Sequence, residues 1–182
     1  MHRKTAKEIL ADSFRELAQE KPIDKITVKD IADNCRYSQA TFYRQFKDKY
    51  DLIAWDHAQR VGKIMARIGT EKYDWRQTVM DAALSFQAMK RYLANLFRHT
   101  SGHDSFARHM TEIHYNALKQ YILKNSEEKS MDEMTDMYVR VYVLGTVSLT
   151  CEWILGKCKA TPEELALVYE KSLPLPLHAY LM

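Results

Sequence analysis

The chain has 182 residues, of which 46% are apolar and 28% charged, and its formal net charge is +3. This apolar share is ample for a buried core in one domain or two small ones. No stretch approaches 18 consecutive apolar residues, and the basic N-terminus is not followed by an apolar segment, so we expect neither a membrane span nor an export signal.

The positive charge is unevenly distributed. Residues 1–50 hold 11 Lys or Arg against 8 Asp or Glu, whereas residues 51–182 hold 16 of each. The whole excess of three charges therefore lies in the first part of the chain, where it favours contact with phosphates, although chance is the alternative for so small a number.

The cysteines indicate a reducing compartment. Cys35, Cys151 and Cys158 form neither a CxxC motif nor an even set, so we expect free thiols in the cytoplasm. Cys151 and Cys158 could sense oxidants, but small cysteines of a packed core are the more common case.

Five glycines and four prolines leave few interruptions, so the sequence predicts long helices and no strand. The fold class that we predict is all-α with about nine helices. In chain order, these helices cover about 3–20, 27–34, 38–46, 48–69, 74–89, 92–98, 105–124, 132–157 and 162–173.

Residues 27–52 carry the most specific pattern. Thr27 and Asp30 form a short capping box, and Ser38 is a good N-cap for a second short helix that ends near Phe46. Two short helices across a turn of three to four residues, the second with a polar outer face, are typical of a helix-turn-helix that enters the DNA major groove. A helical corner that only meets water is the alternative.

The run Thr-Val-x-x-Ile-Ala-x-x-Cys-x-Tyr-Ser-x-Ala-Thr-Phe-Tyr-x-x-Phe-x-x-Lys-x-x-Leu over residues 27–52 resembles the DNA-binding signature of the TetR family of bacterial regulators. Three positions depart from the family pattern. Arg36 and Ala40 stand where glycines are usual, and Gln45 stands where histidine is frequent. Arg36 fits less easily than glycine if the turn needs a positive φ.

This resemblance and the polar face together predict the DNA contacts. Gln39 is suited to adenine, the methyl groups of Ala40 and Thr41 to a thymine methyl, and Arg44 to guanine or a phosphate. The resemblance implies phosphate contacts for Thr27, Tyr37, Tyr43 and Lys49. The full predicted set is Thr27, Arg36, Tyr37, Ser38, Gln39, Ala40, Thr41, Tyr43, Arg44 and Lys49.

The resemblance also implies two domains and a homodimer. We expect a DNA-binding domain at 1–48 and a regulatory and dimerisation domain at 49–182, with the helix from 49 to 69 linking them. Residues 132–157 and 162–173 would pair with their copies in a second subunit, because one recognition helix reads too few base pairs. The predicted interface comprises Leu144, Val147, Ser148, Cys151, Ile154, Leu165 and Tyr169. The alternative is a monomer in which both are ordinary core helices.

The middle of the chain is rich in aromatic residues that can line a ligand pocket, although most such residues simply fill cores. The candidates are Phe86, Tyr92, His114, Tyr138 and Tyr142. Neither the ligand nor its existence follows from the sequence. The Trp-Ile-Leu-Gly-Lys run at 153–157, followed by Thr-Pro-Glu-Glu at 161–164, is similar to a branch that includes activators of dihydroxyacetone kinase operons, in which a protein can be the signal.

We expect no catalytic site, no cofactor and no metal. His99 and His103 are four apart, but Thr100 to Gly102 interrupt any helix between them, and no nucleophile elbow, P-loop or dinucleotide motif is present. The sequence thus predicts a cytoplasmic, dimeric, DNA-binding transcriptional regulator. A helical sensor or adaptor that does not bind DNA is the alternative, and a helical metalloenzyme is a remote third.

Overall fold

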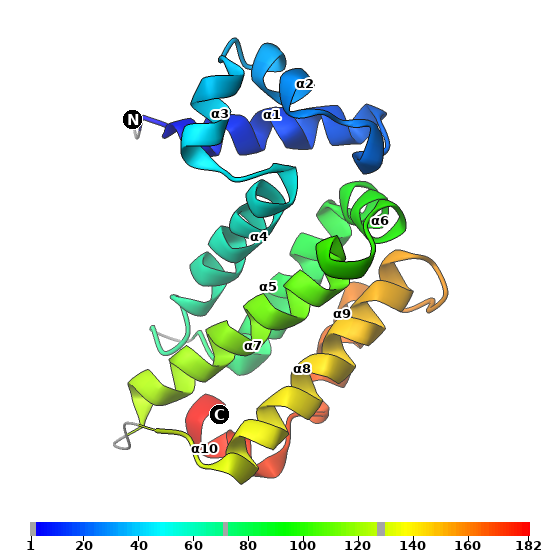
Figure 1. Ribbon diagram of the computed structural model, residues 1–182. Coiled ribbons are helices and arrows are strands. Elements are labelled where there is room, and N and C mark those ends of the chain that lie inside the picture. Colours follow the sequence, from blue (N-terminus) through cyan, green and yellow to red (C-terminus); the bar gives the residue numbers. More distant parts are fainter. Residues whose placement is uncertain (1–2, 71–72, 127–129) are drawn as a thin grey trace.

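The computed structural model describes residues 3–70, 73–126 and 130–182, and in these ranges it contains ten α-helices, three short 3₁₀ helices and no strand (Figure 1). The predicted all-α class is thereby confirmed. The helices are α1 (Ala6–Glu20), α2 (Val28–Asn34), α3 (Gln39–Gln45), α4 (Lys49–Met65), α5 (Trp75–Ala88), α6 (Lys90–His99), α7 (Phe106–Asn125), α8 (Glu133–Ile154), α9 (Pro162–Lys171) and α10 (His178–Leu181). The 3₁₀ helices are η1 (Ile23–Lys25), η2 (Gly102–Asp104) and η3 (Leu175–Leu177).

Side-chain caps fix most helix starts. Thr5, Thr27 and Thr161 each form a capping box with an acidic residue three positions later, and the box predicted at Thr27 includes Asp30. Pro162 occupies the first turn of α9, where its missing N–H costs nothing. Because each cap satisfies backbone N–H groups that the helix itself leaves free, these starts are set locally by the sequence.

Two long helices end earlier than the sequence indicated. α4 stops at Met65 and is followed by turns up to Gly69, which has φ 78°. α8 stops at Ile154 because Gly156, also with φ 78°, reverses the chain, and the amide of Lys157 bonds back to the carbonyl of Glu152 at 2.8 Å. This arrangement is a Schellman motif, which needs a left-handed residue and so ends the helix at the glycine. α10 was not predicted at all.

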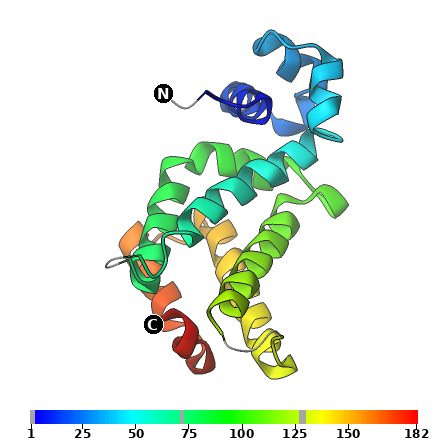
Figure 2. The ribbon, with the colours of Figure 1, turned by 90° about the vertical axis from the view of Figure 1, so that its left-hand side faces the viewer.

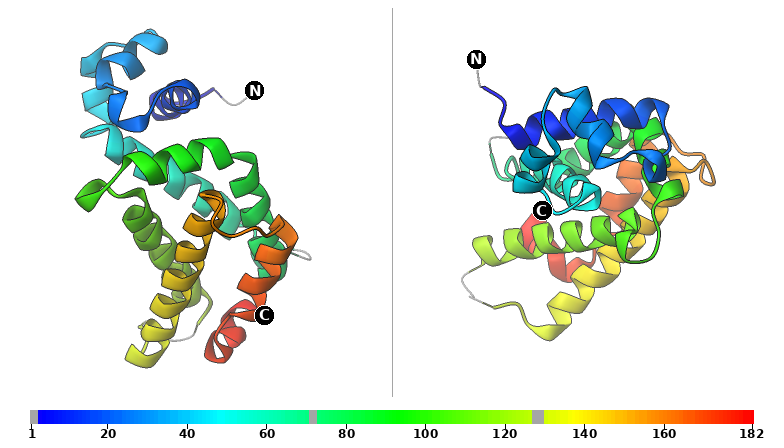
Figure 3. Two further views of the ribbon diagram at one scale, coloured as in Figure 1. Left: turned by 90° about the vertical axis from the view of Figure 1, so that its right-hand side faces the viewer. Right: turned by 45° about the horizontal axis from the view of Figure 1, so that its top comes forward.

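The helices form a small unit at one end and a larger bundle below it (Figures 1 and 2). α1, α2 and α3 make the small unit. α4 leaves it and runs along α7, α7 packs against α8, and α5 packs against α9. α6 lies beneath α1, as Figure 3 shows from two further sides. α4 therefore belongs to both the small unit and the packing of the bundle, and α6 also contacts both.

Candidate nucleic-acid interface and ligand cavity

α2 and α3 form a braced helix-turn-helix. Ile31 and Phe42 are fully buried between them, and Phe46, directly after α3, is buried in the same core. The hydroxyl of Ser13 in α1 donates to the carbonyl of Ile31 at 2.7 Å, which fixes α2 on its support. The two short helices are thus held by tertiary contacts, as helices of seven residues require.

The turn between them contains Arg36 in a left-handed conformation with φ 59°, and no other non-glycine residue of the described chain has a positive φ. The amide of Tyr37 bonds to the carbonyl of Ala32 at 2.8 Å across this turn. The turn therefore does need the conformation that glycine adopts freely, and an L side chain there costs roughly 1–2 kcal/mol.

The outer face of α3 is free. Gln39, Ala40, Tyr43 and Arg44 are exposed, whereas Thr41 is partly covered. Arg44 donates to the Thr41 hydroxyl at 3.1 Å, so its guanidinium lies along the helix rather than away from it. Of the other predicted DNA contacts, Thr27, Arg36 and Ser38 are exposed and Tyr37 is half-buried. Arg36, Tyr37 and Ser38 directly precede α3, whereas Thr27 caps the start of α2.

Lys49, the last predicted contact, has partners inside the protein. Its ammonium donates to the carbonyls of Ile23, Asp24 and Ile26 at 2.9, 3.3 and 2.8 Å. Burial lowers the pKa of this ammonium. The side chain thereby ties the start of α4 to the η1 segment that leads into α2, a role that its place in the sequence did not indicate.

We therefore expect Lys49→Met to destabilise the protein by about 1–3 kcal/mol, because three carbonyls lose a charged donor at a partly solvated site. Urea unfolding would measure the loss. Lys47→Met is the matched control, since it removes the same charge two residues away without removing such bonds. Equal stability of the two variants would leave Lys49 as a phosphate contact only.

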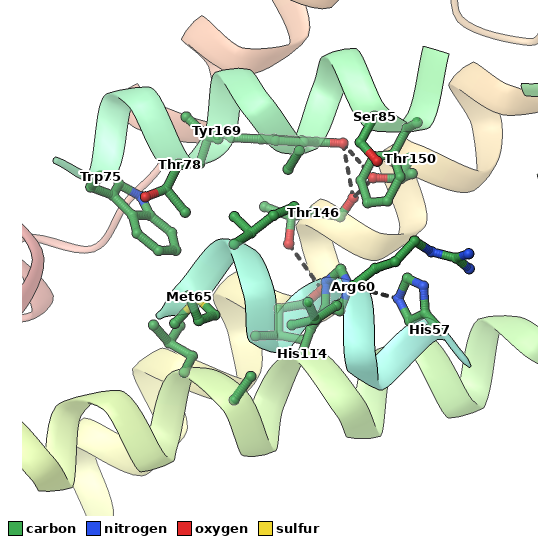
Figure 4. A pocket seen from close by; sticks show the side chains of 18 of the residues that line it. His57, Arg60, Met65, Trp75, Thr78, Ser85, His114, Thr146, Thr150 and Tyr169 are labelled. Atoms are coloured by element: carbon green, nitrogen blue, oxygen red, sulfur yellow. Dashed lines mark hydrogen bonds between the residues drawn. The ribbon is translucent and has the colours of Figure 1, made fainter. Parts of the chain in front are cut away.

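A cavity lies in the middle of the bundle, between α4, α5, α7, α8 and α9 (Figure 4). The volume of this cavity that the centre of a water molecule can reach is about 110 Å³. Trp75, Val79 and Phe86 of α5 form one side, and His114 and Leu118 of α7 lie opposite. A mostly apolar, partly open space with a few polar groups is typical of a small-molecule site.

The hydroxyl groups at the cavity are largely engaged by the protein. The Tyr142 hydroxyl donates to the carbonyl of Tyr169 at 2.8 Å. The Tyr169 hydroxyl lies 2.5 Å from that of Thr150 and donates to the carbonyl of Thr146 at 3.1 Å. These bonds join α8 to α9, and burial raises the pKa of both phenols, which stay neutral.

The imidazole rings of His57 and His114 are in contact at the wall of the cavity. The Nε2 atoms of His57 and His114 are 3.0 Å apart, and the rings stack with centroids at 5.1 Å. Burial lowers the pKa of His114 to about 4 and depresses that of His57 as well. His57 is 2% exposed, and His114 retains accessible surface because it lines the cavity. Both rings are therefore neutral. In the hydrogen bond between them, the Nε2 atom of one ring donates and the Nε2 atom of the other accepts.

The structure places three of the five predicted ligand residues at the cavity: Phe86, His114 and Tyr142. Tyr92 is buried beneath α1 and does not line it, and Tyr138 is 36% exposed on the outside of α8. Arg60, Trp75 and Thr150 also line the cavity, although the sequence did not indicate them as ligand residues. Single lining residues from separate helices leave no spacing pattern that could have revealed them.

The predicted interface residues divide into two groups. Val147, Ile154, Leu165 and Tyr169 are at most 5% exposed within one subunit, so their side chains face its core and not a partner. Leu144 and Ser148 are exposed, and Cys151 is partly so.

The surface of α8 and α9 instead presents other apolar side chains, which we call the α8/α9 face. Its members are Met134, Met137, Tyr138, Val141 and Leu144 of α8 and Leu167 and Val168 of α9. Its α8 members recur at helical spacing on the side of α8 opposite the core. The sequence alone did not indicate which side of α8 faces the core.

Within the described residues, no group of three or more His, Cys, Asp or Glu side chains could hold a metal ion. Those residues also form no helix that is long and apolar enough to cross a bilayer.

Two family models match the chain. Residues 10–54 match the bacterial regulatory proteins of the tetR family, and residues 73–173 match a transcriptional regulator C-terminal region. No curated protein matches the sequence.

Several solved structures share the fold across nearly the whole chain. The dihydroxyacetone kinase operon activator DhaS has a TM-score of 0.63 and 18% identity, with 96% of each chain covered. A TetR transcriptional regulator from Rhodococcus sp. RHA1 has a TM-score of 0.65 and 14% identity, with 95% of this chain and 97% of that one covered. Thermus thermophilus FadR, a repressor in complex with lauroyl-CoA, has a TM-score of 0.60 and 16% identity, with 97% and 95% covered.

The helix-turn-helix, the helical bundle below it and the two family models, the second of which spans more than half of the chain, lead to one conclusion: this protein belongs to the TetR family of DNA-binding transcriptional regulators.

Proposed function

We propose that this protein is a cytoplasmic homodimer that binds a two-fold symmetric operator through α3 and changes its affinity when a molecule occupies the central cavity. The observation that carries the proposal is the exposed, hydrogen-bonding face of α3 on a unit that α4 connects to the bundle. Such a face fits the major groove, and two copies about 34–36 Å apart would read two half-sites.

Gln39 is the side chain of α3 best placed to read a base. It is exposed at the first position of the helix, and the N-terminal residues of recognition helices are those that contact base edges. We expect Gln39→Ala to relax the preference at one position of each half-site and to cost about 1–3 kcal/mol of binding free energy.

Selection from a randomised operator library, followed by anisotropy titrations of the selected sites, measures this effect. Gln45→Ala is the matched control, because Gln45 lies at the other end of the same helix. An unaltered base preference in Gln39→Ala would show that α3 docks with another side toward the bases.

The α8/α9 face supports the dimer. Seven apolar side chains of one subunit are exposed there, with fractions from 36% for Tyr138 to 68% for Val141. Exposed apolar side chains in such numbers are rarely left in water, and pairing with its own copy about a two-fold axis would cover them.

The cavity supports a small-molecule effector, and a protein effector is the second possibility. α4 lines the cavity with Arg60 and Met65, and its first turn is tied to the DNA-binding unit through Lys49. An effector shifts the equilibrium between two arrangements of α4 only through its differential affinity for them, with typical coupling of about 1–3 kcal/mol. FadR bound to lauroyl-CoA shows that a protein of this fold can hold a ligand.

Anisotropy titrations with DNA fragments at several salt concentrations test the proposal. A regulator should bind a selected operator at least about a thousandfold more tightly than random DNA. Weak binding that is equal for all sequences would instead favour a helical sensor or adaptor that keeps the fold without reading DNA.

A further inference from the structure

The charge of Arg60 does not reach the central cavity. Among the described residues that line the cavity, Arg60 alone carries a permanent charge, but the Nε and Nη2 atoms of its guanidinium have no accessible surface. Its Nη1 atom lies 2.7 Å from a carboxylate oxygen of Asp56. The guanidinium points away from the space between α5 and α7, as Figure 4 shows. The cavity therefore offers nothing that could compensate a charge on a ligand.

Most of the polar atoms at the wall of the cavity are either bonded or out of reach. The hydroxyls of Tyr142, Tyr169 and Thr150 are hydrogen-bonded within the protein. The Nε1 atom of Trp75 and the Nδ1 atom of His57 have no partner within the described chain, but neither has accessible surface. The space of about 110 Å³ is of the order of a cavity that holds one benzene ring, roughly 150 Å³. A small apolar body therefore suits this wall.

The Nδ1 atom of His114 differs from these groups. The Nε2 atom of His114 bonds to that of His57, whereas its Nδ1 atom has no hydrogen-bond partner within the described residues and keeps accessible surface. The Nδ1 atom of His57 is buried, and orphaned buried N–H groups are rarer than unused acceptors, so His57 carries its hydrogen on Nε2. His114 then accepts at Nε2 and carries its own hydrogen on Nδ1, because a neutral imidazole has one donor and one acceptor.

We propose that the central cavity binds a small uncharged molecule with an apolar body and one hydrogen-bond acceptor, such as a ketone, and that the Nδ1–H of His114 donates to this acceptor. The proposal rests on the proposed function, because it names the class of effector that the cavity would take. A charged ligand would be buried without a partner, which costs far more than burying a neutral group that is hydrogen-bonded. The acceptor in turn satisfies an N–H group that the protein leaves unpaired.

His114 also connects such a ligand to α4. His57 belongs to α4 and His114 to α7, so the bond between their Nε2 atoms joins the two helices. An acceptor on the Nδ1–H of His114 makes its Nε2 atom a stronger acceptor, since hydrogen bonds in a chain polarise one another. Occupancy of the cavity therefore strengthens the contact between α7 and α4, the helix that leads to the DNA-binding unit.

Three probes with one six-membered ring test the proposal: cyclohexanone, methylenecyclohexane, which has a similar shape but no acceptor, and the charged cyclohexanecarboxylate. Calorimetry on the full chain at neutral pH measures their binding. We expect cyclohexanone to bind at least about tenfold more tightly than the carboxylate, because nothing in the cavity compensates the charge. His114→Phe should weaken the binding of cyclohexanone relative to that of methylenecyclohexane by about fivefold, since only the ketone loses a donor.

Variants on the same helices serve as controls. His109→Phe removes an imidazole of α7 that does not line the cavity, and it should leave the affinity for the ketone unchanged. Ala82→Leu fills part of the cavity and should weaken the binding of both uncharged probes by about tenfold or more, because a packed interior has no spare volume. Ala88→Leu, at an exposed position of the same helix α5, should not.

A carboxylate that binds as tightly as the ketone, equal losses of ketone and alkene in His114→Phe, or no binding of either uncharged probe at millimolar concentration would each overturn the proposal. Nitrogen-15 NMR of the wild-type protein decides if His114→Phe does not fold. The Nδ1 atom of His114 should carry a hydrogen and shift more with cyclohexanone than with methylenecyclohexane, and a hydrogen on its Nε2 atom instead would contradict the assignment. Operator binding without any probe tests the proposed function separately, so a protein that binds its operator but no ketone refutes only the ligand class.

Discussion

Val141→Asp is expected to convert a dimer into a folded monomer and to weaken operator binding by at least about a hundredfold. Val141 is 68% exposed in one subunit, so a carboxylate there leaves the monomer intact. In a two-fold dimer both copies would be buried without partners, and a buried unpaired charge costs several kcal/mol. A monomer binds only one half-site at a time, so it loses the avidity that a dimer gains by binding two linked half-sites.

Sedimentation and anisotropy measure the two parts of this result. Leu84→Asp is the matched control, because Leu84 is a 46% exposed leucine on α5, outside the α8/α9 face. Val147→Asp should behave differently and impair folding, since Val147 is 3% exposed in the subunit core. A wild-type protein that sediments as a monomer at micromolar concentration would rule out the α8/α9 face as an interface.

Acid is expected to destabilise the protein through the buried imidazoles. Burial lowers the pKa of His114 to about 4 in the fold, against an ordinary value of 6.5. Between these values the unfolded chain binds more protons, so stability is complete above pH 6.5 and is lost as the pH falls toward 4. At about 1.4 kcal/mol per pKa unit, His114 alone accounts for a loss of at most about 3 kcal/mol. His57, whose pKa is also lowered, acts in the same direction.

Urea unfolding at pH 7 and pH 4.5 measures this loss. His114→Phe should flatten the dependence, because phenylalanine keeps a ring beside Phe86, whose centroid lies 6.4 Å away, and cannot be protonated. His103→Gln removes an exposed imidazole and is the control. A pH dependence that persists in His114→Phe would assign the effect to other groups, the paired carboxylates first.

Local signals in the sequence were enough to predict the helix-turn-helix. The caps at Thr27 and Ser38 act on amides within three residues, and the spacing of Ile31 and Phe42 shows which sides are buried. The geometry of the turn was left open by the sequence, because Arg36 stands where a glycine is usual, and the structure gives Arg36 a positive φ of 59°.

The cavity and the α8/α9 face could not be predicted in the same way. α8 has apolar residues on most of its circumference, so periodicity could not distinguish the buried Val147 from the exposed Val141. The pairing of His57 with His114 joins residues 57 positions apart. Such features arise only when separate helices come together.

α4 is long enough to transmit a movement from the cavity to the DNA-binding unit. Its 17 residues span about 25 Å at 1.5 Å per residue, from the ammonium of Lys49 to the cavity wall at Met65. In the proposed dimer, a tilt of about 5° about the lower end of α4 would move its upper end by about 2 Å, and a two-fold axis would double this to about 4 Å between the two copies of α3. Set against a half-site spacing of about 34–36 Å, a shift of that size would change the fit of both recognition helices to the groove. Under the proposed function, displacements smaller than one side chain at the cavity would thus control the affinity for the operator.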